Sequence, residues 1–418
     1  MKYSEFGNKF LTDSGILRLM DDLGSAMAEG GKDMLMLGGG NPAHIPEVES
    51  LFRSRIEEIV DNKNEFECVV GNYDTPRGEK YFIHYLAEML SENFGWKIGP
   101  ENIALTNGSQ TAFFYLFNMF AGAHGGGQKK KILLPLAPEY IGYSDVGLTD
   151  DFFMTFKPAI SHLDNRMFKY QVNFNDLNIT DEIGAICVSR PTNPTGNVLA
   201  DDEINKLSKL AVKHNIPLII DNAYGTPFPN IIFTDAEPIW DQHIVLSMSL
   251  SKLGLPGTRT GILIANEETI EMIVRMNAVL SLAPNSVGVA LALSLFKSSQ
   301  IIEVSKNIIL PFYQKKVKKA FDLLSSELEG LDCYIHKPEG ALFLWLWMKN
   351  LPISDQELYT RLKGRKTLVV PGHYFFPGLK EEWRHKSECI RITYTMAEDI
   401  VEKGLKNIAD EVRKAYGA

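Results

Sequence analysis

The residues whose types and spacing could do chemistry gather around Lys252. This lysine closely follows an apolar segment of strand length, Ile244–Ser249. A lysine at the end of a buried strand has a lowered pKa, and its neutral amine can form a Schiff base with an aldehyde. Ser249, Ser251 and Arg259 are near it in the sequence and could bind a phosphate group beside the amine. An isolated lysine would more often extend into solvent, so the serines and the arginine carry this interpretation.

A second anion site is predicted at Gly108-Ser109-Gln110. An apolar segment ends at Thr106, and a helical pattern begins at about Ser109. The backbone N–H groups and the dipole of a helix start attract phosphate. A serine at this position is often only a helix cap, which stays an alternative for Ser109.

A carboxylate is predicted at the edge of the same sheet. Asp221 ends the strand candidate Leu218–Asp221, and Tyr224 follows three residues later. Ligands bind beyond the carboxyl ends of parallel strands, so Asp221 is expected to face a ligand. The ordinary alternative for an isolated aspartate there is a helix cap.

The elements that must position these residues alternate between strand and helix. Strand candidates at Ile103–Thr106, 131–136, 185–188, 218–221, 244–249 and 261–265 alternate with helical patterns from about Ser109 and Asp202, which predicts an α/β unit with a mostly parallel sheet. Beyond about Asn266 a long amphipathic stretch, 303–330, precedes strand candidates at 341–348, 367–370 and 390–394. We therefore expect a large domain over 46–296 and a smaller α+β domain made of 1–45 and 297–418.

The pattern S-x-S-K-x-x-x-x-G-x-R-x-G at Lys252, together with N-P-x-G at Asn193, resembles the fold type I, aspartate-aminotransferase-like enzymes that use pyridoxal 5′-phosphate (PLP). This resemblance implies an α/β fold in which a mostly parallel, seven-stranded sheet is flanked by helices and joined to the smaller domain. It also implies that Lys252 is both the Schiff-base lysine and the proton shuttle of a ping-pong transamination. Asp221 is expected to protonate the pyridine nitrogen, and Tyr224 to bind the phenolic oxygen of the cofactor.

The same resemblance implies the remaining contacts. The cofactor-binding residues are expected to be Gly108, Ser109, Gln110, Tyr140, Asn193, Asp221, Tyr224, Ser249, Ser251, Lys252 and Arg259, with Tyr73 reaching the phosphate of a partner subunit in a homodimer. Asn193 is expected to touch the phenolic oxygen of the cofactor and border the substrate, and Arg391 and the turn at Gly40 to bind the substrate carboxylate. A guanidinium fork suits that group, although Arg391 could also be an outward-facing edge charge.

Several unbroken stretches are similar to the valine–pyruvate aminotransferases within this superfamily: LGGGNPAHIPE, NIALTNGSQTAFFYLFN, SRPTNPTGNV, DNAYGTPFP, HKPEGALFLWLW and VPGHYFFPG. This similarity implies transfer of an amino group from L-valine to pyruvate, giving 3-methyl-2-oxobutanoate and L-alanine. Other apolar amino acids, or a C–S lyase reaction on the same fold, stay as alternatives. A PLP-sensing transcription regulator is disfavoured, because only a short, non-basic segment precedes the first matching stretch.

Composition narrows the partners. The net charge of −9 opposes binding to nucleic acid or to an anionic membrane surface, so small molecules are the expected partners. Neither a signal peptide nor a membrane span is predicted, and a cytoplasmic location is expected. The spacing of Cys68, Cys187, Cys333 and Cys389 suggests buried thiols and no metal site. We interpret His44 and His336 as structural.

Overall fold

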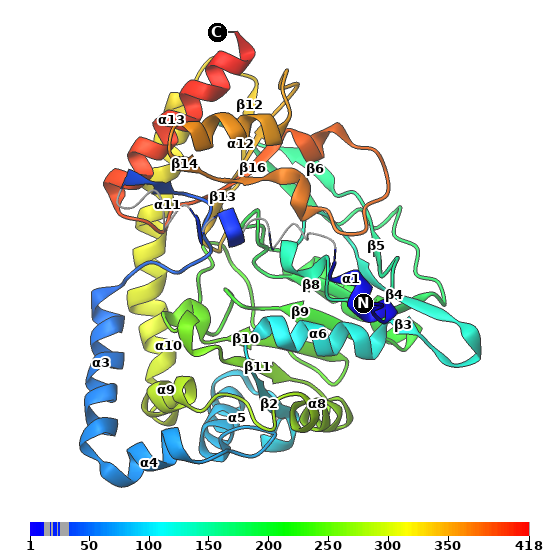
Figure 1. Cartoon of the computed structure of the whole chain (residues 1–418), viewed down its shortest axis with the longest axis vertical. Helices are drawn as coiled ribbons and strands as arrows, with labels where there is room; N and C mark the ends of the chain where they lie inside the picture. The colour runs from blue at the N-terminus through cyan, green and yellow to red at the C-terminus, as the bar shows by residue number, and fades with distance from the viewer. Residues whose placement is uncertain (12–16, 18–19, 23, 26–32, 418) are drawn as a thin grey trace.

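Two sheets organise the chain. The computed structural model describes residues 1–11, 17, 20–22, 24–25 and 33–417. Figure 1 shows the larger sheet in the lower part of the molecule and the smaller sheet above it, with helix α11 (Leu310–Glu327) running between the two regions.

The larger sheet has eight strands. In spatial order they are β2 (Ile103–Thr106), β11 (Gly261–Ile264), β10 (Ile244–Ser249), β9 (Leu218–Asp221), β8 (Ile183–Ser189), β4 (Lys129–Leu134) and β3 (Gly122–Ala123), with β5 (Phe153–Thr155) also paired with β4. Strands β10, β9, β8, β4 and β5 pair in parallel, whereas β11 is antiparallel to both of its neighbours. The mostly parallel α/β prediction is confirmed. The sheet has one strand more than predicted, because the two-residue strand β3 forms a short antiparallel pair with β4.

Helices cover both faces of this sheet, which is why most of its strands are mainly apolar rather than alternating. Ala104, Ile219 and Val245 pack against α6 (Ser109–Phe120) and α8 (Glu267–Leu280). Neighbouring strand residues such as Leu105 and Leu246 point to the opposite face. That face is covered by α5 (Lys80–Phe94), α7 (Asp201–His214) and α9 (Val287–Lys297). Helices α3 (Pro46–Asp61) and α4 (Lys63–Gly71) lead into this unit from the N-terminal side.

The smaller sheet has six strands. Their spatial order is β15 (Val370–Pro371), β16 (Cys389–Thr393), β13 (Phe343–Met348), β12 (Cys333–His336), β7 (Met167–Gln171) and β6 (Ala159–His162). The β6–β7 hairpin falls within the range 46–296 that the sequence analysis assigned to the large domain, yet β7 pairs with β12. Part of segment 1–45 lies outside the described residues, and the proposed domain boundaries stay a prediction.

Most of the remaining elements pack near the smaller sheet or at the N-terminus, whereas α10 (Gln300–Val304) packs against α9. They are α1 (Glu5–Lys9), the parallel pair β1 (Leu35–Met36) and β14 (Thr367–Leu368), α10, a π-helical turn (Ser305–Ile309), α12 (Asp355–Gly364) and α13 (Glu398–Tyr416). On α13, Val401, Leu405, Ile408 and Val412 recur at helical spacing and are buried, so one stripe of this helix joins the core.

Two further sequence predictions can be compared with the structure. Cys187, Cys333 and Cys389 are buried free thiols as expected, but Cys68 is exposed on α4, whose residues are largely in contact with solvent. Within the described part of the chain, no single helix is long and apolar enough to cross a membrane. By length and composition alone, a bent pair, Val287–Lys297 with Gln300–Glu327, passes the same test at an angle of 94°.

Candidate active site

A cavity of about 320 Å³ lies where the strands of the larger sheet end. The carboxyl ends of β2, β8, β9 and β10 meet there, at Thr106, Ser189, Asp221 and Ser249. Most of the predicted site residues line this cavity: Gly40, Ser109, Gln110, Tyr140, Asn193, Asp221, Tyr224, Ser249, Ser251, Lys252, Arg259 and Arg391. The alternating strands and helices therefore bring together residues that are far apart in the sequence, as Gly40 and Arg391 are, 351 positions from each other.

Lys252 enters the cavity from the short 3-10 turn Ser251–Leu253 that follows β10. Its Nζ donates a hydrogen bond of 2.7 Å to the carbonyl oxygen of Gly40 and lies 5.3 Å from the centre of the Tyr224 ring. Burial, and to a smaller extent the positive charge of Arg391, lower the pKa of Lys252 to about 8, against the opposing effect of the Asp221 carboxylate. Near neutral pH a useful fraction of this amine is therefore uncharged, as proton transfer requires.

Asp221 is the last residue of β9, between Ser189 of β8 and Ser247 of β10. Its carboxylate accepts hydrogen bonds from the hydroxyl of Tyr143 at 2.8 Å and from the backbone N–H of Ala223 at 3.1 Å. Burial raises the pKa of Asp221 to about 6, against the effect of these two donors. A carboxylate in this position is ready to pair with a cation in the cavity.

Arg391 is the central residue of β16, between Trp345 of β13 and Val370 of β15. Its guanidinium is buried, and it donates to Asn193 Oδ1 at 2.8 Å and to the carbonyl oxygen of Gly38 at 2.7 Å. Its Nε has no hydrogen-bond partner among the described residues. Arg391 is therefore not an outward-facing edge charge but a buried cation with a donor still to satisfy.

Aromatic rings surround the two cations. The guanidinium carbon of Arg391 lies 4.2 Å from the centre of the Phe343 ring and 5.3 Å from that of Phe375. Tyr224 is buried, which raises the pKa of its phenol and keeps it protonated, and Asn193 is its hydrogen-bond partner. The Tyr224 hydroxyl is thus a donor inside the cavity.

The predicted anion site at the start of α6 is built around Gly108. This glycine has a φ of 87°, and a Cβ atom placed on it would lie 2.3 Å from Nη2 of Arg259. Gly261, on the neighbouring strand β11, is also close, since a Cβ there would lie 2.8 Å from the backbone N of Ser109. The two glycines allow the Arg259 guanidinium and the first N–H groups of α6 to converge, which suits an anion.

The hydroxyl of Ser249, the first of the two serines before Lys252, is hydrogen-bonded within the turn. The Ser249 hydroxyl donates to the carbonyl oxygen of Thr260 at 3.2 Å and accepts from the backbone N–H of Ser251 at 3.0 Å. Its only proton is therefore already used to hold the turn that carries Lys252. Ser109 Oγ likewise contacts the carbonyl oxygen of Met248 at 3.3 Å, a longer bond.

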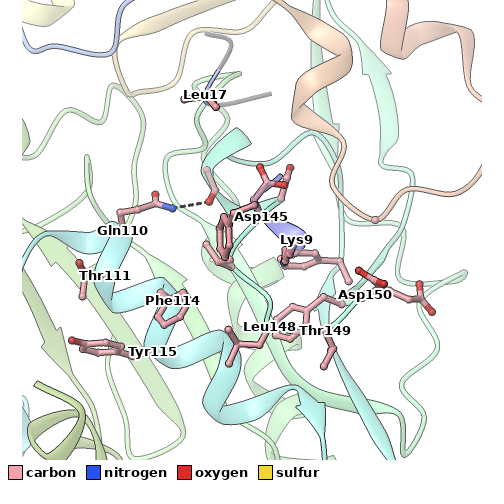
Figure 2. A pocket seen from close by; sticks show the side chains of 18 of the residues that line it. Lys9, Leu17, Gln110, Thr111, Phe114, Tyr115, Asp145, Leu148, Thr149 and Asp150 are labelled. Atoms are coloured by element: carbon pink, nitrogen blue, oxygen red, sulfur yellow. Dashed lines mark hydrogen bonds between the residues drawn. The ribbon is translucent and has the colours of Figure 1, made fainter. Parts of the chain in front are cut away.

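Tyr140 and Gln110 form one wall of the cavity. The Tyr140 ring packs at right angles to that of Tyr143, with 5.4 Å between their centres. Gln110 donates from Nε2 to the carbonyl oxygen of Gly142 at 2.7 Å, the bond drawn as a dashed line in Figure 2. A Cβ on Gly142 would lie 2.3 Å from Cε1 of Tyr140, so the glycine leaves room for this ring.

Tyr73 does not reach the cavity of its own chain. It is 84% exposed and follows α4 on the surface. The two histidines interpreted as structural do not line the cavity either. His336 is buried, which lowers its pKa to about 3, and its Nε2 accepts from the backbone N–H of Tyr170; His44 pairs with Glu49 at the surface.

Some residues of this site were missed in the sequence. Met20, Asn41, Phe113 and Ile141 also line the cavity, and Glu139 with Tyr143 lies directly behind Asp221. Phe113 is one helical turn after Ser109 on α6, and Ile141 directly follows Tyr140. Both could have been predicted, because residues at such spacings from a site residue lie beside it. Nothing local marks Met20, whose place depends on where the N-terminal segment folds back.

The comparisons with known proteins agree with this geometry. A sequence model described as aminotransferase class I and II matches residues 53–408. The chain is 50% identical over 416 residues to the valine–pyruvate aminotransferase of Escherichia coli strain K12, covering 100% of this chain and 99% of the relative.

Solved structures give the same result. The crystal structure of valine-pyruvate aminotransferase from Salmonella typhimurium LT2 has a TM-score of 0.89 at 50% identity, covering 96% of this chain and 99% of that one. A kynurenine aminotransferase from Pyrococcus horikoshii, solved in complex with PMP, has a TM-score of 0.77 at 18% identity, covering 96% of this chain and 95% of that one, and shares the fold. The chain belongs to the class I and II aminotransferase family, whose enzymes depend on PLP.

Proposed function

We propose that this aminotransferase transfers the amino group of L-valine to pyruvate, giving 3-methyl-2-oxobutanoate and L-alanine, and catalyses the reverse reaction. The observation that carries the proposal is that one cavity holds the Lys252 amine, the Asp221 carboxylate and the Arg391 guanidinium. Two relatives named for valine and pyruvate, each 50% identical to this chain, support the choice of substrates.

The residues of the cavity fit PLP. The turn at Gly108 and Ser109, with Arg259, would hold the phosphate, because a Cβ on Gly108 would fill the space beside the guanidinium. Asp221 would pair with the pyridine nitrogen, and Tyr224 and Asn193 would hydrogen-bond the phenolic oxygen. Tyr140 would cover one face of the ring.

Ser251 and Ser249 have different proposed roles at the phosphate. Since the Ser249 proton is used within the turn, we propose that Ser249 shapes the turn and that Ser251 contacts the phosphate. The Nε2 of Gln110 already donates to the carbonyl oxygen of Gly142. We propose that Gln110, held in this way, helps to position the pyridine ring that Tyr140 would cover.

When bound, PLP supplies an aldehyde that takes up the amino group and a pyridine ring that stabilises negative charge at the substrate Cα. Lys252 would hold the aldehyde before the substrate arrives and, as a neutral amine, would remove the proton from Cα. Its lowered pKa of about 8 suits this task near neutral pH.

Arg391 would bind the α-carboxylate that both substrates share. The Nε of this guanidinium has no hydrogen-bond partner in the part of the chain that the structure describes, and its Nη2 donates to the uncharged carbonyl of Gly38. A carboxylate could therefore take both donors. Fixing the carboxylate would set the direction of the Cα–H bond toward Lys252, so that proton removal is favoured over loss of carbon dioxide.

The cavity favours a small apolar side chain. Of the arginines that the structure describes, only Arg259 and Arg391 line it, and both have a proposed task. No arginine therefore remains there for a second carboxylate of a substrate such as aspartate. Met20, Phe113 and Ile141 add apolar surface.

We also propose a homodimer in which Tyr73 reaches the phosphate of the partner's site. Its 84% exposure supports this role, as do Val279 and Leu282, which are 83% and 61% exposed beside the end of α8. Next to them lies a hollow of about 1480 Å³, into which Thr111, Phe114 and Tyr115 project from α6 (Figure 2). Sedimentation velocity tests the oligomeric state. The cytoplasmic location stays a prediction.

The experiment that tests the function uses the visible absorption band of the bound cofactor. We expect L-valine to remove this band and pyruvate to restore it. Lys252→Ala should abolish both changes, whereas Lys206→Ala, at an exposed lysine paired with Asp202, should alter neither. A band that persists with L-valine but responds to another apolar amino acid would overturn the substrate assignment alone. Release of a thiol from cysteine-like substrates, with no transfer to pyruvate, would favour a C–S lyase.

A further inference from the structure

A buried carboxyl group behind the cavity is joined by two hydroxyls to the Asp221 carboxylate, which lines the cavity. Glu139 contacts Ser189 Oγ at 2.6 Å, and Ser189 Oγ lies 3.3 Å from the hydroxyl of Tyr143. Tyr143 in turn donates to Asp221 at 2.8 Å. The chain of contacts therefore runs from Glu139 to the carboxylate that faces the cavity.

Glu139 is the most deeply placed member of this chain. It is 0% exposed, and its second carboxyl oxygen accepts from the backbone N–H of Ser189 at 3.0 Å. None of the groups with the largest effects on its pKa is a lysine, arginine or histidine. A buried carboxylate without a cation is costly, so such a group tends to keep its proton.

Two arrangements of protons that keep Asp221 ionised are consistent with these distances. If Glu139 is ionised, Ser189 donates to it and Tyr143 donates to Asp221, so no proton lies between the two hydroxyls and two negative charges are buried together. If Glu139 is protonated, it donates to Ser189, Ser189 donates to Tyr143, and Tyr143 donates to Asp221. The second arrangement uses every contact and leaves a single negative charge, on Asp221.

We propose that Glu139 is held as a neutral acid and acts as a positioning residue, which directs the hydroxyls of Ser189 and Tyr143 to donate toward Asp221. This inference rests on the proposed role of Asp221 in pairing with the pyridine nitrogen. Glu139 touches neither substrate nor cofactor. Its effect is to fix the single negative charge at the end of the chain that faces the cavity.

The electrostatics of the surrounding groups agree. Burial, with a smaller contribution from the charge of Asp221, raises the pKa of Glu139 to about 8, although the donors from Ser189 and Tyr140 oppose this. Tyr143 and Cys187 also face the pair, as do Tyr140 and Tyr224 at the cavity, and burial raises the pKa of each. These four groups are therefore neutral. Lys252 faces Asp221 across the cavity, and its positive charge lowers the pKa of that carboxyl. Asp221 is thus the member of the chain of contacts that is expected to be charged near pH 7.

Infrared spectroscopy of the apoenzyme at pH 7 tests the protonation state without any cofactor. We expect a carbonyl-stretch band of a buried carboxylic acid that disappears in Glu139→Gln. The matched control is Glu203→Gln, because Glu203 is also buried but accepts only backbone N–H groups, from Val172 and Ala200. Absence of the Glu139-dependent band overturns the proposal.

Affinity of the apoenzyme for PLP tests the positioning role. Glutamine can still donate to Ser189, so Glu139→Gln should raise the Kd less than about threefold, whereas Glu139→Ala should raise it more than about tenfold. Tyr143→Phe removes the donor to Asp221 and leaves Glu139 in place, so it should raise the Kd for PLP more than about fivefold. This variant keeps the test decisive if Glu139→Ala does not fold. Equal effects of Gln and Ala overturn the proposal. If Asp221→Asn leaves the Kd unchanged while the infrared band is present, the proposed function of Asp221 fails instead.

Discussion

The amine of Lys252 donates a 2.7 Å hydrogen bond to the backbone carbonyl of Gly40, which lies 212 positions earlier in the chain. Two residues before Gly40, the carbonyl of Gly38 accepts a bond of the same length from Arg391. One short backbone segment therefore holds both cations of the cavity. The two carbonyl groups are uncharged, so they accept hydrogen bonds from Lys252 and Arg391 without neutralising either charge. A cofactor and a substrate carboxylate can therefore still bind to these two cations.

The reactivity of Lys252 should depend on pH in a way that its burial sets. Because its pKa is lowered to about 8, the amine is neutral above that pH, and its rate of modification by an acylating reagent should rise through pH 8 in the apoenzyme. Free Nα-acetyl-lysine in the same tube should respond about 2 pH units higher. Mass spectrometry of the peptide that contains Lys252 measures the rate.

The charge of Asp221 should affect the pH at which the modification rate of Lys252 rises. Since this carboxylate raises the pKa of Lys252, Asp221→Asn should move the midpoint of the profile to lower pH. A midpoint that moves upward, or one for the wild type that coincides with Nα-acetyl-lysine, would contradict the electrostatic description of the site.

Replacing Arg391 by lysine should impair both half-reactions equally. A lysine keeps the charge but loses the planar pair of donors, and Asn193 and Gly38 would lose their partner. We expect kcat/KM for L-valine and for pyruvate to fall about 100-fold each, which corresponds to about 2.7 kcal/mol. Steady-state kinetics with each substrate varied in turn measures this.

A matched control is available at Arg365, which lies outside the cavity and donates to Asn407 and Glu411 of α13. Arg365→Lys should leave kcat/KM within about twofold. A loss for L-valine alone in Arg391→Lys would argue against a shared carboxylate site.

Much of this site could be predicted because strand ends are visible in the sequence. The strands Ile103–Thr106, Leu218–Asp221 and Ile244–Ser249 have the predicted bounds, since burial on both faces makes each a mainly apolar run. Parallel strands end at one edge, so the residues that follow them had to meet. Arg391 is the exception, because alternation on its strand did not distinguish a buried from an exposed guanidinium.

The remaining features depend on contacts between distant segments. Pairing of β7 with β12 joins Phe168 to His336, and no local pattern announces it. Glu139 is adjacent to the predicted Tyr140, yet its neutral state depends on Ser189 and Asp221 from two other strands. The proposed place of Tyr73 depends on a second chain altogether.

The turn at Gly108 should not tolerate a side chain. With a φ of 87°, an alanine would be strained, and its Cβ would displace the guanidinium of Arg259 from the phosphate site. We expect Gly108→Ala to raise the Kd for PLP more than about tenfold, or about 1.4 kcal/mol. Titration of the apoenzyme by fluorescence measures it. Gly364→Ala, at an open position at the end of α12, serves as the control, and equal affinities in the two variants would refute the assignment.

Finally, the buried acids should make the apoenzyme less stable as the pH rises. The pKa of Glu139 is about 8 in the folded chain and about 4.5 ordinarily, so between these values the folded state binds more protons than the unfolded state. Stability is therefore lost with rising pH over that window, and Asp221, with a pKa raised to about 6, adds to the loss at its lower end. The Tm of the apoenzyme from pH 5 to pH 8 should fall less steeply in Glu139→Gln than in the wild type. Glu203→Gln should retain the wild-type slope, and parallel curves for Glu139→Gln and the wild type would mean that Glu139 is ionised throughout. Measurement below pH 8 keeps Lys252 out of the comparison, because its lowered pKa makes stability depend on pH only above that value.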